Sequence, residues 1–456
     1  MSRDVFRIAG ACGFWGDRND ALADQVRGGP IDAVLLDYLA EVTLSILRVQ
    51  KLRDPARGYA TDFLKALAPV IKEIDERGIQ VTTNAGGVNP EGCAQAVLEL
   101  ARAGGLSKLR VGVVTGDDLS GRLKDLRRAG VSLAQLDTGA PFDTIAERVI
   151  SANAYLGAEP IADALRAGAR IVVTGRCTDS ALALGPLLAH FGWSKTDWDH
   201  RAAGVVAGHL LECGGQASGG NFAAGWESVP NLARLGYPIA EIARDGSCIL
   251  TKHPTLGGLV TPAVLKEQLI YEIGDPERYV TPDAVADFTS LALEDLGRDR
   301  VRVSGARGDP PPDHLKVSIA YQDGWMNQVA LTFVWPEAEK RARATADLLL
   351  TRAAQRGLRL DAHHVDLIGL SGAHGPMVPP LASDPNEVLL RVAVRSADRD
   401  AAEAFGEEIA PLVLCGVPGA CSGLLSARPK AHAVVNFWPA LVPRNTVEAK
   451  LEVLSP

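Results

Sequence analysis

The sequence predicts an α/β fold with a mostly parallel N-terminal sheet, flanking helices and a C-terminal α+β domain. Short apolar runs alternate with helical patterns through the first half, and parallel strands require such crossover helices. Glycine or polar residues follow each run directly. Near Asp283 the pattern changes to alternating runs that are typical of hairpins. Together these observations indicate Rossmann-like layering followed by a second domain.

The strands expected in the first half are short, apolar and separated by helices. Strands are predicted at residues 5–9, 33–36, 80–83, 109–114 and 171–174, and helices at 39–52, 63–74 and 90–103. Pro69 is expected to kink the second helix, and Gly78 to end it. Pro90 suits the first position of the third helix.

The second half mixes helices with alternating runs. Helices are predicted up to residue 213 and at 262–271, 337–356 and 401–410, and strands at 247–250, 300–303, 316–321, 328–334, 388–394, 433–437 and 447–453. We expect an α/β domain at residues 1–285 and an α+β domain at 286–456, the latter as an interface or a lid. Arg428 could reach such an interface.

Composition excludes several classes of protein. The 456 residues are 47% hydrophobic and 22% charged, which is typical of globular proteins, and the net charge of −8 argues against nucleic-acid binding. No apolar run approaches the roughly 20 residues that span a membrane. The N-terminus lacks a signal-peptide pattern, so a cytoplasmic location is expected. The seven cysteines lack C-x-x-C spacing, which argues against disulfides and structural zinc. A homo-oligomer is the expected state.

Polar and glycine-rich segments follow five predicted strands. They are residues 10–17, Asp37 with Glu41, residues 84–89, residues 115–118 and residues 175–179. Because ligands bind beyond the carboxyl ends of parallel strands, these segments predict one polar cleft. The glycine spacing at 10–17 supports nicotinamide or flavin binding poorly, since Trp15 stands where the backbone would approach a phosphate.

Two groups of charged residues at strand ends are candidates for chemistry. Asp37 and Glu41 could form an acid–base pair or hold Mg²⁺, or could simply accept backbone hydrogen bonds near a helix N-terminus. Arg176 suits a carboxylate or phosphate. The alternative is an ion pair between Arg176 and Asp179, with Thr178 capping the next helix.

His209 and Glu212 lie three residues apart and should share a helix face. We expect His209 to be a general base oriented by Glu212, with a metal half-site as the weaker alternative. The loop that follows could offer backbone donors to an oxyanion. Cys213 could be a nucleophile, although nothing in the sequence indicates a lowered pKa.

The remaining expected binding residues come from loops and strand ends. Lys252 could bind an anionic group, or could be a solvated lysine. The substrate-binding set is Asn84, Gly86, Gly87, Asn89, Arg176, Thr178, Gly214, Gly215, Gln216, Ser218, Gly219 and Lys252. The catalytic set is His209, Glu212, Asp37 and Asp179, and the metal candidates are Asp37 and Glu41.

Several long blocks together resemble one family. They are GFWGD (13–17), DYLAEVTLS (37–45), NAGGVNP (84–90), GRCTDSALALGP (175–186), HLLECGGQASGGNF (209–222) and EQLIYEIGDPERYVTPD (267–283). This order of blocks is similar to the acyclic terpene utilisation protein A (AtuA) family. The resemblance implies a role in the catabolism of citronellol, geraniol and related branched acids, through pathways that use coenzyme A thioesters.

The expected function is lyase chemistry on a branched acyl-CoA or a small polycarboxylate. Hydration, dehydration or carbon–carbon cleavage beside a carbonyl needs a base, an acid and an oxyanion site, and no redox cofactor. The enzyme could also use a divalent cation such as Mg²⁺. One alternative is an ATP–Mg²⁺-dependent acyl-activating enzyme, and another is a non-catalytic subunit of a catabolic complex.

Overall fold

The computed structural model describes residues 4–379, 383–421 and 429–456. The chain forms two compact units, Met1–Ala320 with Phe437–Pro456, and Tyr321–Asn436. The boundary predicted at residue 285 falls inside the first unit. Arg428, the expected interface residue, lies outside the described residues.

A mixed ten-stranded sheet forms the centre of the first unit, in the order β11-β12-β8-β7-β1-β2-β3-β6-β4-β19. The strands β1, β2, β3, β6 and β4 are parallel, and the flanking strands pair antiparallel. The predicted α/β class is therefore confirmed. The parallel strands are β1 (Val5–Gly10), β2 (Ala33–Leu36), β3 (Gln80–Thr83), β4 (Val111–Thr115) and β6 (Ile171–Thr174). The others are β7 (Ile239–Ala243), β8 (Cys248–Thr251), β11 (Ala292–Asp295), β12 (Val301–Ser304) and β19 (Lys450–Leu454).

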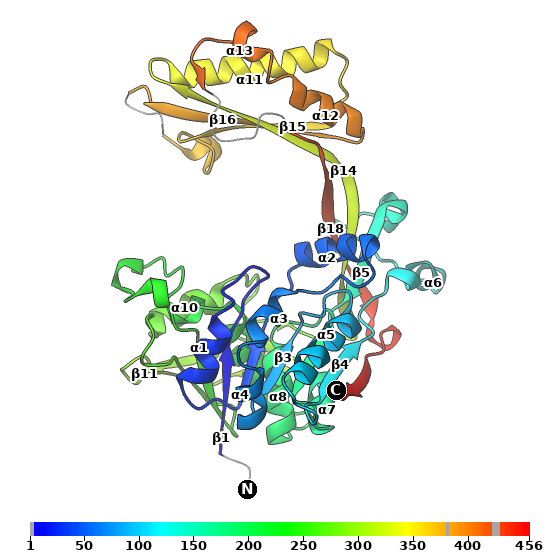
Figure 1. Ribbon diagram of the computed structural model, residues 1–456, viewed down its shortest axis with the longest axis vertical. Coiled ribbons are helices and arrows are strands. Elements are labelled where there is room, and N and C mark those ends of the chain that lie inside the picture. Colours follow the sequence, from blue (N-terminus) through cyan, green and yellow to red (C-terminus); the bar gives the residue numbers. More distant parts are fainter. Residues whose placement is uncertain (1–3, 380–382, 422–428) are drawn as a thin grey trace. The chain divides into compact units, whose positions relative to one another are not determined.

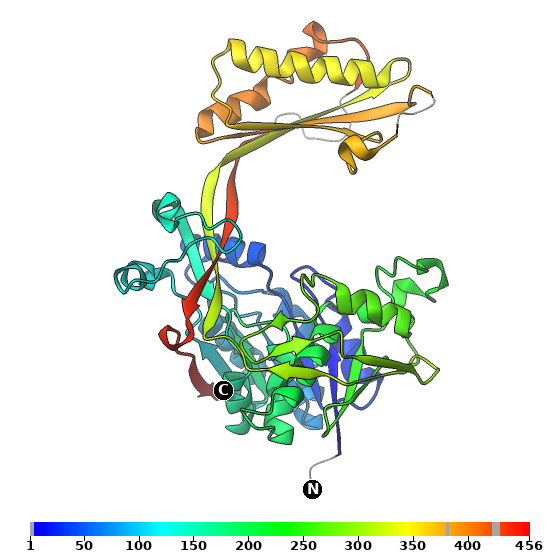
Figure 2. The same cartoon turned by 180° about the vertical axis from the view of Figure 1, so that it is seen from behind.

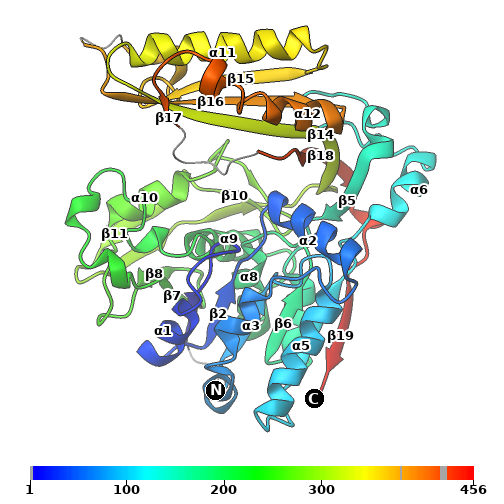
Figure 3. The same ribbon diagram turned by 45° about the horizontal axis from the view of Figure 1, so that its top comes forward.

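Both faces of this sheet are covered, which explains why the central strand β2 is apolar throughout. In β2, Ala33 and Leu35 pack into one core, while Val34 and Leu36 pack into the other. The helices α3 and α5 lie in front of the strands in Figure 3, and α8 and α9 lie behind them. One layer holds α1 (Ala21–Gly28), α3 (Asp62–Leu67), α4 (Ile71–Arg77) and α5 (Pro90–Ala103); the other holds α7 (Glu159–Arg166), α8 (Ala181–Phe191), α9 (Trp198–Glu212) and α10 (Pro262–Ile270).

Local sequence signals set the helix ends. Asn89 accepts a hydrogen bond from the Gly92 amide and, with Pro90, starts α5. The single helix expected around Pro69 is two helices, α3 and α4, because proline cannot donate the backbone bond that would join them. Gly78 ends α4 with a left-handed φ of 71°.

The second unit packs helices on one face of a sheet in the order β15-β16-β14-β17. Alternate residues of β16, from Val388 to Val394, pack in a core with α11. The long strand β14 is continuous where two strands were predicted, and it pairs with β18 and β5. Figures 1 and 2 show β14 and β18 passing from one unit into the other. The bounds are β14 His314–Val334, β15 Ala362–Ile368, β16 Glu387–Ser396, β17 Ala420–Cys421, β18 His432–Pro443, α11 Ala338–Gln355, α12 Arg399–Glu407 and α13 Leu412–Cys415.

The first unit also contains a three-stranded sheet in the order β13-β10-β9, the strand β5 that pairs with β14, and the helices α2 and α6. Their bounds are α2 (Glu41–Arg53), α6 (Leu123–Arg128), β5 (Val149–Ala154), β9 (Tyr279–Val280), β10 (Val285–Asp287) and β13 (Arg307–Asp309). Among the residues described, no helix has the length and apolar character needed to cross a bilayer.

Candidate functional site

A pocket of about 1130 Å³ opens in the first unit beyond the carboxyl ends of the parallel strands. Residues after β1, β2 and β6 line it, including Gly13, Asp37 and Asp179. The segments after β3 and β4, which were expected to join them, do not line the pocket. Three of the five predicted strand ends therefore meet at one site.

Asp37 is a buried carboxyl held by a network of amides. Asn84 Nδ2 donates to Asp37 Oδ1 at 2.6 Å, and the Leu39 amide donates to the same oxygen at 3.0 Å. Asn84 in turn accepts from the Tyr38 amide at 2.7 Å. Burial, together with the negative charge of Asp179, holds the pKa of Asp37 well above its usual range. Asn84 thus positions Asp37 from behind the pocket wall.

Arg176 and Asp179 form an ion pair on the pocket wall. The buried guanidinium donates to Asp179 Oδ1 at 2.6 Å and to the Leu39 carbonyl at 3.0 Å, and it lies 4.3 Å from the centre of the Tyr155 ring. Thr178 lines the pocket beside them. The alternative role of Thr178 as a helix cap is not observed, because Ser180 is the N-cap residue of α8 and makes no side-chain cap bond.

Glu41 is held by Tyr155 and Lys316. Tyr155 Oη donates to Glu41 Oε1 at 2.5 Å, and Lys316 Nζ lies 3.5 Å from that oxygen. Burial raises the pKa of Glu41, but nearby Arg176 and the Tyr155 hydroxyl outweigh burial and lower it to about 2. Tyr155 and Lys316 were not expected as site residues from the sequence, because each is a single polar residue with no motif around it.

The His209–Glu212 pair is arranged differently from the prediction. Glu212 lines the pocket, whereas His209 is buried behind it. His209 Nδ1 lies 2.9 Å from Glu212 Oε1, and His209 Nε2 lies 2.8 Å from the Gln268 carbonyl oxygen. Because both ring nitrogens already have partners, His209 cannot reach a substrate as the expected general base. Glu212 is the member of the pair that faces the pocket.

The glycine-rich loop after α9 contributes only part of its expected binding surface. Gly215 and Gln216 line the pocket, but Gly214, Ser218 and Gly219 do not. Ser218 is buried and donates to the Gly215 carbonyl, so it stabilises the loop itself.

The other expected binding residues have structural roles. A Cβ on Gly86 would lie 2.4 Å from the Thr174 carbonyl oxygen, so close backbone packing requires glycine there. Gly87 has a left-handed φ of 56°. Asn89 caps α5, and Lys252 Nζ bonds the Leu256 carbonyl at 3.0 Å and Asp299 at 3.1 Å. None of these residues lines the pocket.

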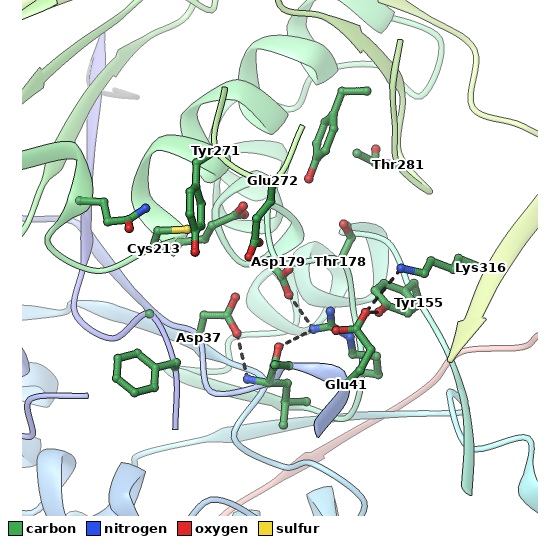
Figure 4. Close-up of a pocket in the computed structure, with 18 of the residues that line it drawn as sticks. Asp37, Glu41, Tyr155, Thr178, Asp179, Cys213, Tyr271, Glu272, Thr281 and Lys316 are labelled. Carbon is green, nitrogen blue, oxygen red and sulfur yellow. Dashed lines mark hydrogen bonds and ion pairs between the residues drawn. The ribbon is translucent and has the colours of Figure 1, made fainter. Parts of the chain in front are cut away.

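The facing wall comes from β9 and the segment between α10 and β9, which belong to a family block of the sequence but were not expected to form part of the site. Tyr271, Glu272 and Tyr279 line the pocket. Glu272 adopts a left-handed φ of 59°, a strained conformation that is often found at functional sites. Figure 4 shows Glu272 extending toward Asp179 from across the pocket.

Cys213 and the proposed cation ligands fit their chemical roles poorly. Burial raises the pKa of the Cys213 thiol, which disfavours the nucleophilic thiolate. Asp37 precedes α2, and Glu41 begins it, so the two do not share a helix face. Over residues 4–379, 383–421 and 429–456, no group of three His, Cys, Asp or Glu side chains could hold a metal ion.

Comparison with known proteins gives one family. The model of the family described as "Acyclic terpene utilisation family protein AtuA" matches residues 6–453. Searches of curated proteins and of solved structures found no significant match. Because the family model spans nearly the whole sequence and both compact units, the chain belongs to the AtuA family of acyclic terpene utilisation proteins.

Proposed function

We propose that the chain is an enzyme of acyclic terpene catabolism that performs acid–base chemistry in this pocket. The reaction is of lyase type, either hydration or dehydration, or carbon–carbon cleavage, beside the carbonyl of a branched acyl substrate. Family membership supports the metabolic setting. The arrangement of carboxyl groups supports the chemistry.

The observation that carries the proposal is the pair of carboxyl groups, Glu212 and Asp37, in one pocket. Burial raises the pKa of both groups, while Asp179 beside them is ion-paired with Arg176. The charge of Glu212 also raises the pKa of Asp37, and two carboxyl groups that disfavour each other's ionisation hold different protonation states at one pH. That difference supplies the proton acceptor and the proton donor that a lyase needs.

The charge of the pocket favours a thioester over a small polycarboxylate. Six carboxyl groups line it, and Arg18, Arg176 and Lys316 are its lysine and arginine residues. A substrate with several carboxylates would be repelled by this surplus of acids, whereas a thioester is uncharged at its reacting carbon. Lys316 pairs with Glu41 at 3.5 Å, but its side chain is 45% exposed and can also contact a negative group at a distance from that carbon. The six acids are Asp17, Asp37, Glu41, Asp179, Glu212 and Glu272.

In ATP-dependent activation the phosphates themselves react, and the surplus of acids disfavours phosphates at the reacting position, where a thioester is uncharged. A P-loop motif is also absent from the sequence. A non-catalytic subunit would not require buried carboxyl groups to converge on one pocket. Neither alternative is favoured by a specific observation.

The test is Glu212→Gln, which keeps the shape of the side chain and removes its ability to exchange a proton. Turnover of branched acyl-CoA thioesters should fall at least about 100-fold, while the melting temperature stays close to that of the unaltered protein. Glu227→Gln, at an exposed position, is the matched control. Thermal-shift measurements with coenzyme A thioesters, ATP and NAD⁺ test the ligand class, because binding raises the melting temperature. Full turnover in Glu212→Gln would refute the proposal.

A further inference from the structure

We infer that Glu212 and His209 work as one proton-transfer unit, in which Glu212 exchanges the proton with the substrate and His209 takes up the charge from behind. This inference rests on the proposed function. Glu212 is the catalytic residue of the unit, and His209 is a positioning residue because it acts only through Glu212.

The tautomer of His209 is fixed by Gln268. The Gln268 carbonyl oxygen lies 2.8 Å from His209 Nε2 and can only accept a hydrogen bond. Nε2 must therefore carry a hydrogen. The Gln268 side chain also donates to the His209 carbonyl at 2.8 Å, so the residue is held through its ring and its backbone.

With Nε2 protonated, a single proton lies between His209 Nδ1 and Glu212 Oε1, which are 2.9 Å apart. That proton is on Oε1 when the histidine is neutral, and on Nδ1 when the pair is an imidazolium with a carboxylate. In both arrangements Oε2 carries no proton. Within the part of the chain that the structure describes, Oε2 is buried in the pocket wall and has no hydrogen-bond partner. Oε2 is thus the position at which the unit can accept a proton.

In the transfer, a substrate proton moves to Glu212 Oε2, and the electron pair of the bond it leaves stays on the substrate. Where the shared proton is on Oε1, it moves to His209 Nδ1 in the same step. The result is a neutral Glu212 carboxyl group and an imidazolium, so the unit changes from no net charge to one positive charge. The reverse step returns the proton to the leaving group.

The surroundings favour this positive charge and keep water away from it. The His209 ring lies between Tyr279 and Phe288, with centroid distances of 5.7 and 5.4 Å. Burial lowers the pKa of His209, but the hydrogen bond and charge of Glu212 outweigh burial and raise it. The charged and titratable groups that surround the unit are Asp37, Arg176, Asp179, Cys213, Glu272 and Tyr279.

A direct test uses the whole protein with ¹⁵N-labelled histidine. The nine histidine signals are titrated by NMR, and His209 is assigned by its loss in His209→Asn. Nε2 should stay protonated throughout the titration. In Glu212→Gln the ring should lose its charge at a lower pH than in the unaltered protein, because burial is then opposed only by the weaker effects of the Gln268 carbonyl and Glu272. A hydrogen on Nδ1 with none on Nε2, or an unchanged titration in Glu212→Gln, would overturn the inference.

The kinetic test compares His209→Asn with Glu212→Gln and with His200→Asn, a matched control on the same helix. Asparagine can still donate to Glu212 Oε1 but cannot accept the proton. His209→Asn should lower kcat about 10–100-fold with little change in KM, and should move the rising limb of the pH–rate profile to higher pH. A lower kcat with an unchanged pH–rate profile would show that His209 only packs against Glu212. That result would overturn the inference and would not affect the proposed function. Full activity in Glu212→Gln would refute both the proposed function and this inference.

Discussion

At the scale of single residues, the position of Asp37 depends on Asn84. Replacing Asn84 by alanine removes the donor to Asp37 and leaves the Tyr38 amide without its acceptor. Each unsatisfied buried group costs about 1–3 kcal/mol. We expect Asn84→Ala to lower the free energy of unfolding by about 3 kcal/mol in urea titrations, whereas Asn445→Ala, at an exposed position, should stay within about 0.5 kcal/mol of the unaltered protein.

The loss in Asn84→Ala should also depend on pH. Since the pKa of Asp37 is raised in the folded protein, its contribution to stability is present below the unfolded pKa and is lost as the pH rises through the folded value. Asn84 lowers that pKa by bonding the carboxylate. Its removal should therefore cost more near pH 8 than near pH 5. Equal losses at both pH values would contradict this account of Asp37.

The sequence predicted several acidic residues of the pocket, but it did not show which side chains point into the pocket. Asp37, Asp179 and Glu212 follow strands or end a helix, and the pocket contains all three. The expected general base, His209, is on the far side of Glu212, because spacing of three residues places two side chains together without showing which one faces a cavity. Tyr155 and Lys316 come from segments paired across the fold, and local pattern carries no signal for them.

At the scale of elements, the turn between β6 and α8 is held by Asp117, which follows β4. Asp117 Oδ2 accepts from the Arg176 amide and from Asn153 Nδ2, both at 2.8 Å. Burial raises the pKa of Asp117 to about 6. The contribution of Asp117 to stability is thus complete below the unfolded pKa near 4 and decreases as the pH rises through about 6, by roughly 2–3 kcal/mol.

Asp117→Asn should abolish this pH dependence, because the amide oxygen can accept both hydrogen bonds without an ionisation. We expect the variant to match the unaltered protein near pH 4 and to exceed its unfolding free energy by about 1–3 kcal/mol near pH 8. Urea titrations at the two pH values measure the difference. Asp118→Asn, whose carboxylate caps the exposed Ser120 amide, is the neighbouring control. A variant that is less stable at both pH values would show that the carboxylate charge itself holds the turn.

The elements that the sequence predicted well are those with local signals. The parallel strands are short runs, mostly apolar, between glycine and polar residues, and they occur within about two residues of their expected positions. The strand β14 was expected as two, because Gln322, Asp323 and Gly324 have the composition of a turn. Its pairing with β16 and β18 overrides that local preference. Such long-range pairing cannot be derived from periodicity alone.

At the scale of the whole molecule, the chain leaves the first unit at Ala320 and returns at Phe437. The final strand β19 pairs with β4, so the last residues complete the large sheet. Trp438 Nε1 also donates to the Leu133 carbonyl at 2.9 Å within the first unit. The second unit is therefore an insertion into the first. An insertion has two boundaries, so the single boundary predicted from the sequence could not describe it.

Replacing residues 321–436 by a short glycine–serine linker should leave the first unit folded. The two hydrophobic cores of the large sheet share no residue with the core of the second unit, and every residue that lines the pocket belongs to the first. The ends to be joined lie on β14 and β18, which pair with each other. Calorimetry should show one cooperative transition for this variant and two for the full chain, because separate cores unfold separately. Residues 321–436 expressed alone should reproduce the second transition. A shortened chain without cooperative unfolding would show that the first unit needs the insertion to fold.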